Sequence, residues 1–144
     1  HGINYAKKYQ IPYIFINTDY RLYENKIFLF LKKYKISFIC LAGYMKIISK
    51  NLIKNYQKRI LNIHPSLLPK FKGLNTFSRM LKNNEIKAGC TVHYVNEKLD
   101  GGKNIIQKLF FISVNDNEKT LEKKTQKLEH KAFPEGIIKI FRNS

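Results

Sequence analysis

Long apolar runs and targeting signals are missing from this 144-residue chain. Its apolar runs at residues 27–31 and 38–45 are too short to cross a bilayer. No charged start followed by an apolar core and a small-residue cleavage site is present. These absences predict a soluble, cytoplasmic protein that has no membrane partner.

Cysteines are also scarce. Cys40 and Cys90 are the only two, and they lie in separate apolar segments instead of a C-x-x-C pair. This spacing argues against a disulfide framework and against a metal site. We expect two buried structural thiols and no bound metal.

Acidic residues are outnumbered, with 10 Asp and Glu against 27 Lys and Arg, which gives a formal net charge of +17. Such a charge attracts polyanions. The lysines are spread through the whole chain, however, and do not form one stripe. We interpret them as solvated surface, and a basic nucleic-acid-binding module remains the less favoured hypothesis.

The length fits one domain with a real core, over residues 1–144. The first two-thirds of the chain alternates between helical and extended patterns. Helices are predicted at residues 2–9, 21–33, 50–57 and 74–83, and strands at 12–16, 37–42 and 60–64. The nearly continuous apolar run at 37–42 is typical of a parallel strand covered on both faces. Ser49 is a candidate N-cap for the helix that follows it.

The last third changes pattern. Strands at 89–95 and 104–112 flank a turn-rich segment, which predicts an antiparallel pair, and a long helical segment follows at 117–141. Pro134 or Gly136 should kink or split that helix. With no linker or repeat, the economical fold is a single α/β domain with a Rossmann-like, three-layer open sheet, mostly parallel with an antiparallel C-terminal part.

Polar side chains gather at the end of the 60–64 strand. Period-2 alternation turns Asn62 and His64 to one side and Ile63 to the core, and Pro65 then ends the strand. An amide N–H can donate to a forming oxyanion, and an imidazole exchanges protons near neutral pH. Acyl-type transfer is one reading of this pair, and simple capping of a loop is the other.

A second candidate element is the turn Leu99-Asp100-Gly101-Gly102. Paired glycines permit positive φ and a close approach of the backbone to a ligand, and they present Asp100 from a constrained position. Together with Asn62 and His64, Asp100 supplies a base. Taken alone, an Asp in such a turn is usually a residue that only serves the turn.

These blocks resemble the folate-dependent formyltransferases in order and spacing. The blocks are Asn62-Ile-His-Pro-Ser-Leu-Leu-Pro69, Gly73-Leu-Asn-Thr76, Gly89-Cys-Thr-Val-His-Tyr-Val95 and Leu99-Asp-Gly-Gly102. The phosphoribosylglycinamide formyltransferases are the most similar group. Formyltetrahydrofolate hydrolases usually carry a second His at the position of Pro65 and an acid at that of Gly101, so they are the runner-up. Methionyl-tRNA formyltransferases continue into a second domain.

The resemblance implies an activity and three catalytic residues. A formyl group passes from 10-formyltetrahydrofolate, the co-substrate, to the amine of glycinamide ribonucleotide in purine biosynthesis. Asn62 donates to the formyl oxyanion, His64 stabilises the tetrahedral intermediate, and Asp100 relays protons from the amine towards the folate nitrogen. No metal takes part, and the protein is expected to be a monomer or a weak homodimer.

The resemblance also implies binding residues. The folate pocket is expected to involve Met45, Lys46, Ile47 and Ile48 from one segment and Asn96, Glu97, Lys98 and Leu99 from another. Lys46 stands where an Arg is common, and each of the apolar members Met45, Ile47 and Ile48, taken singly, is more simply an ordinary core residue. Glu129, with Gln126 as the weaker candidate, is expected to contact glycinamide ribonucleotide, or else is merely solvated. His93 and His130 are each either close to the site or structural.

One departure from the pattern lies at the front of the chain. Members of the family begin with a strand, a phosphate-binding loop and a helix, and no such unit precedes the residues that match. We therefore expect this sequence to lack its N-terminal β-α unit. We also expect the 144 residues alone to be poorly stable and nearly inactive.

Overall fold

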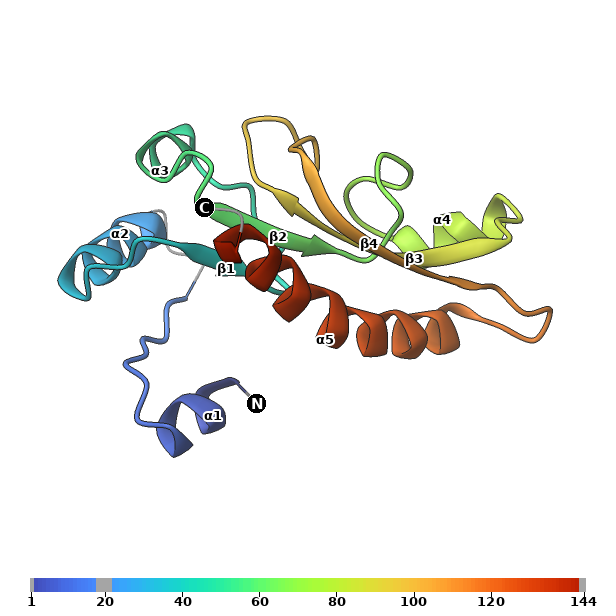
Figure 1. Cartoon of the computed structure of the whole chain (residues 1–144), viewed down its shortest axis with the longest axis horizontal. Coiled ribbons are helices and arrows are strands. Elements are labelled where there is room, and N and C mark those ends of the chain that lie inside the picture. Colours follow the sequence, from blue (N-terminus) through green and yellow to red (C-terminus); the bar gives the residue numbers. More distant parts are fainter. Residues whose placement is uncertain (1, 18–21, 143–144) are drawn as a thin grey trace. The chain divides into compact units, whose positions relative to one another are not determined.

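A computed structural model describes residues 2–17 and 22–142 (Figure 1). The chain divides into two compact units, with the boundary between Ser37 and Phe38. Within the described ranges, no helix is long and apolar enough to span a membrane.

The first unit contains two helices and an extended segment. The helices α1 (Gly2–Lys8) and α2 (Tyr23–Lys33) confirm the prediction, although Arg21 lies outside the described residues. The strand predicted at residues 12–16 is wrong, because this run has no regular structure. A strand needs a neighbour for its backbone N–H and C=O groups, and none of the described strands pairs with this run.

The second unit is built on one four-stranded sheet, ordered β1 (Ile39–Leu41), β2 (Ile60–His64), β3 (Lys87–Tyr94) and β4 (Asn104–Phe111). The pair β1–β2 is parallel, and β2–β3 and β3–β4 are antiparallel. The α/β class with an antiparallel C-terminal part is therefore confirmed. The parallel part is smaller than expected, because the run at 12–16 adds no strand to the sheet.

Helix α5 (Glu118–Arg142) covers one face of the sheet (Figure 1). Its Ala132 is buried in a core cluster with Leu61, Ile63, Cys90 and Val92 of β2 and β3. Of the predicted kink or split, the split is wrong, since α5 continues through its internal proline as one helix. A proline inside a helix costs about 3 kcal/mol. Burial of the apolar face of α5 against two strands offsets that cost, which local sequence reasoning does not include.

Short helices connect the strands. In front of α3 (Lys50–Asn55), the hydroxyl of Ser49 accepts a hydrogen bond from the backbone N–H of Leu52 at 3.2 Å, which confirms the predicted cap. Helix α4 (Thr76–Lys82) precedes β3. Cys90 is buried as predicted, but Cys40 is exposed, so the prediction for Cys40 was wrong. Cys40 lies on β1, an edge strand of the described sheet, which packs against a neighbouring strand on one side only.

Candidate active site

Strand β2 presents two polar side chains to the face of the sheet that α5 does not cover. Asn62 pairs with His93 of β3, and His64 pairs with Thr91, so these four residues share that face. Ile63, between them, lies in the core cluster beneath α5. The predicted alternation along β2 is confirmed.

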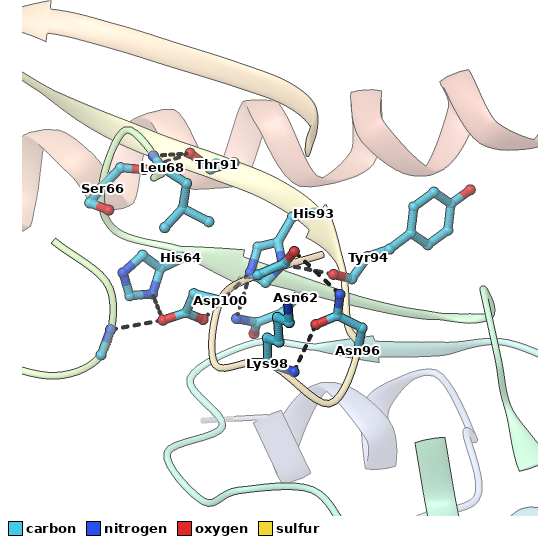
Figure 2. A network of polar contacts seen from close by, with 12 residues as sticks. Asn62, His64, Ser66, Leu68, Thr91, His93, Tyr94, Asn96, Lys98 and Asp100 are labelled. Carbon is cyan, nitrogen blue, oxygen red and sulfur yellow. Dashed lines mark hydrogen bonds and ion pairs between the residues drawn. The ribbon is translucent and has the colours of Figure 1, made fainter. Parts of the chain in front are cut away.

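Asp100 approaches this face from the turn between β3 and β4, as Figure 2 shows. Its Oδ2 accepts a hydrogen bond from the backbone N–H of Gly73 at 2.8 Å and lies 3.4 Å from Nδ1 of His64. Both the Asp100 and the His64 side chains are only 8% exposed. The structure therefore brings together the three residues proposed from the sequence as catalytic.

The turn that holds Asp100 has a backbone conformation different from the one expected from its paired glycines. Positive φ falls on Asp100 itself, at 45°, and not on the two glycines after it. Aspartate is among the few residue types that tolerate this region. Gly102 is needed for another reason: a Cβ there would overlap the carbonyl oxygen of Tyr94. The glycine allows close packing of the chain against itself.

The protonation of His64 follows from its partners. Its Nε2 lies 2.9 Å from the carbonyl oxygen of Phe71, which only accepts, so the hydrogen-bond network assigns a proton to Nε2. Nδ1 then faces the carboxyl group of Asp100. The contact between the two groups is attractive only with a proton on one of them. The geometry thus places an imidazole nitrogen and a carboxyl group in direct contact, which is the kind of pair that acid–base chemistry uses.

His93 joins the same cluster. It is 2% exposed, and its Nε2 lies 3.3 Å from Nδ2 of Asn62 and 3.7 Å from Oδ1 of Asp100. Burial lowers the pKa of His93, although the nearby Asp100 carboxylate opposes that shift. The sequence left its role open because the register between β2 and β3, which places it beside Asn62, is not visible in a single sequence.

A cavity of about 170 Å³ opens beside these groups. Besides Asn62, His93 and Asp100, it is lined by two segments and a helix residue: Leu41, Tyr44, Lys46, Ile47, Ile48, Ile53, Val95, Asn96, Glu97, Lys98 and Leu99. Every residue predicted to bind folate is among these except Met45, which is 71% exposed. Ile53 and Val95 were not predicted to line the pocket: Ile53 lies outside the family-like blocks, and Val95 ends one of them without an assigned role.

Exposure separates the two readings of the apolar residues here. Ile47 is 83% exposed and Leu99 is 61% exposed, so neither is an ordinary core residue. Ile48 is buried, in contrast. Apolar side chains that stand open to water at a cavity are suited to cover a flat apolar ligand.

A second cavity, of about 240 Å³, adjoins Asp100 and the glycines after it. Leu68, Pro69, Lys72 and Asn104 complete its lining. Asp100 therefore lines both cavities.

The two residues predicted to bind the nucleotide lie elsewhere. Gln126 is exposed and Glu129 is half-buried on α5, and neither lines either cavity. Burial raises the pKa of Glu129. Glu129 is part of α5, and Cys90 of β3 lies in the core cluster beneath that helix. Burial and the nearby Glu129 charge also raise the pKa of Cys90, to about 12. The structure does not bring these two residues to the Asp100 cluster, and His130 is likewise exposed on α5.

Within residues 2–17 and 22–142, no group of three or more His, Cys, Asp and Glu side chains is arranged to hold a metal ion. The polar cluster described above can donate hydrogen bonds and exchange protons through its own side chains.

Comparison with known protein families shows to which family the chain belongs. The family model described as formyl transferase matches residues 2–137. The chain belongs to the formyl transferase family. A trifunctional purine biosynthetic protein adenosine-3 of Drosophila pseudoobscura is 40% identical over 140 residues, covering 94% of this chain. That alignment covers 10% of the fly protein, so this formyl transferase chain spans about a tenth of that relative's length.

Solved structures of formyl transferases agree. Phosphoribosylglycinamide formyltransferase from Anaplasma phagocytophilum is 34% identical with a TM-score of 0.93, covering 99% of this chain and 69% of that one. The enzyme of the same name from Bacillus halodurans is 36% identical with a TM-score of 0.90, covering 96% and 73%. The fold described above is therefore that of the family.

Proposed function

We propose that this protein transfers a formyl group from 10-formyltetrahydrofolate to the amine of glycinamide ribonucleotide, a step of purine biosynthesis. The observation that supports this most is the meeting of Asn62, His64 and Asp100 beside the cavity of about 170 Å³. The names of the similar proteins support the same substrate class.

The side chains that line the cavity of about 170 Å³ are chemically suited to bind a folate. Exposed Ile47 and Leu99 offer apolar surface to a flat pterin ring, and Asn96 offers polar groups for its ring edge. Lys46 and Lys98 add positive charge to the lining, which suits the carboxylates of the glutamate tail. We infer that the folate occupies this cavity with its formyl group towards Asn62.

Asn62, His64 and Asp100 each have a separate role in the reaction. The neutral amine attacks the formyl carbon, a C–N bond forms, and the formyl oxygen becomes an oxyanion. Asn62 donates an N–H to that oxyanion, and the His64 ring, in contact with Asp100, helps to stabilise the negative charge. The Asp100 carboxylate accepts a proton from the attacking amine. That proton passes to the folate nitrogen as its bond to the formyl carbon breaks.

The nucleotide contacts remain a prediction. We infer that Glu129 and Gln126 meet parts of glycinamide ribonucleotide distant from the amine, because neither lies at the polar cluster. Replacement of Glu129 or Gln126 by Ala should therefore raise KM for the nucleotide far more than it lowers kcat.

The function is tested by the dependence of folate turnover on the acceptor. The chain is produced together with any residues encoded before His1, and the formation of tetrahydrofolate is followed with and without glycinamide ribonucleotide. We expect turnover only with the acceptor, with one formylated product for each tetrahydrofolate. Formate release without the acceptor would instead indicate a hydrolase, and salt-sensitive binding to nucleic acid without turnover would indicate a binding module.

A further inference from the structure

His93 is held between a backbone carbonyl and the side chain of Asn62. Its Nδ1 lies 2.9 Å from the carbonyl oxygen of Tyr94. A carbonyl oxygen only accepts hydrogen bonds, so Nδ1 must carry the proton. In a neutral ring the other nitrogen, Nε2, then has a free lone pair.

That lone pair determines which end of the Asn62 side chain faces it. The contact between Nε2 of His93 and the Asn62 side chain is 3.3 Å. Only the NH2 end of the amide can donate to a lone pair, so the carbonyl end of Asn62 must point away. An NH2 group has two N–H bonds, and one of them remains available for another acceptor.

We propose that His93, as the neutral ring with its proton on Nδ1, is a positioning residue that fixes the amide of Asn62 so that its second N–H meets the formyl oxyanion. This role rests on the function proposed above. His93 and Asn62 line the same cavity, as this role requires.

Protonation of Nε2 of His93 would disrupt the orientation of the Asn62 amide. With a proton on both ring nitrogens, Nε2 would become a donor, and Oδ1 of Asp100 lies 3.7 Å from it. Asn62 could then satisfy His93 only by turning its carbonyl oxygen towards the ring. Its NH2 group would leave the position from which it donates to an oxyanion. Protonation of His93 should therefore inactivate the site.

Burial of His93 favours the neutral ring. Burial, the largest effect, lowers its pKa, and His64 of β2 and Lys72 of the following loop act in the same direction. The hydrogen bond to Tyr94 and the Asp100 carboxylate oppose them. Lys46, Glu97 and Lys98 are the further charged residues that line the shared cavity. The net result is a pKa of His93 below its ordinary value, which agrees with the neutral ring that its hydrogen bonds require.

The first test observes the protonation state directly. The protein is prepared with 15N-labelled histidine, and the His93 ring signals are identified by their loss in His93→Gln. We expect nitrogen shifts of a neutral ring protonated on Nδ1 at pH 7. A ring protonated on Nε2, or an imidazolium at pH 7, would overturn the proposal. This readout does not depend on formyl transfer, so its failure is distinguishable from failure of the proposed function.

The second test uses kinetics. Gln at this position can offer an oxygen acceptor to Asn62, whereas Leu offers none, so His93→Leu should lower kcat by about 10–100-fold and His93→Gln by clearly less. KM for the folate should change less than kcat in both variants. The acid limb that His93 contributes to the wild-type pH profile should be absent in His93→Gln.

The exposed His130 on α5 provides the control, because His130→Gln should leave kcat and the pH profile unchanged. Equal losses of kcat in His93→Leu and His93→Gln at matched thermal stability would contradict the positioning role. So would an unchanged kcat in His93→Leu.

Discussion

Asp100→Asn is expected to lower kcat by about 10²–10⁴-fold, which is the usual contribution of a positioned acid–base group. The Asn side chain has nearly the same shape, and its oxygen can still accept the hydrogen bond that Gly73 donates to Oδ2. It cannot accept a proton from the attacking amine. The expected loss is thus chemical, with a thermal midpoint close to that of the wild type and a smaller change in KM. Steady-state kinetics with 10-formyltetrahydrofolate and glycinamide ribonucleotide measure it.

The control for this variant is a second aspartate with similar bonding. Asp116 accepts hydrogen bonds from the backbone N–H of Ser113 at 2.8 Å and from Lys124 Nζ at 2.6 Å, and these bonds lower its pKa to about 2. It lies just before α5 and lines neither cavity. Asp116→Asn should leave kcat unchanged. Normal turnover by Asp100→Asn would remove Asp100 from the mechanism.

Asn62→Ala is expected to lower kcat by about 10²–10³-fold, the cost of losing one donor to an oxyanion. Its side chain is half-buried beside the cavity, so truncation removes the amide without cutting into the core beneath α5. KM for both substrates should change little, because the lost hydrogen bond strengthens only as negative charge develops on the oxygen. Steady-state kinetics at saturating substrate measure the effect.

Asn83 at the end of α4 supplies the matched control. Its side chain donates to the carbonyl oxygen of Arg79 at 2.7 Å, and it is exposed and lines neither cavity. Asn83→Ala should retain wild-type kcat. If Asn62→Ala raised KM with kcat intact, Asn62 would be a ground-state binding residue and not an oxyanion donor.

Local sequence rules predicted the parts of the site that depend on neighbours in sequence. Period-2 alternation placed Asn62 and His64 on one side of β2 and Ile63 in the core. The cap at Ser49 followed from the preference of helix N-termini for side-chain oxygens. Contact between Asp100 and His64 could not be derived in this way, because the two residues are far apart in the chain. Only the resemblance to a family suggested that contact.

The failures have the same origin in contacts distant in sequence. The run at 12–16 has strand-like residues but no described strand to pair with, and Pro134 is tolerated because packing supports α5 from outside. The exposure of Cys40 depends on β1 lying at a sheet edge. The role of His93 depends on the register between β2 and β3, which no local pattern encodes.

The central claim is that the cavity beside Asn62, His64 and Asp100 is where the formyl group reacts. A crystal structure of the protein with a stable analogue of 10-formyltetrahydrofolate tests it most directly. We predict the pterin in the cavity against Ile47 and Leu99, with the formyl-equivalent oxygen within about 3.2 Å of the Asn62 amide nitrogen. An analogue bound elsewhere on the molecule, with Asn62 and Asp100 out of reach of the N10 substituent, would contradict the account.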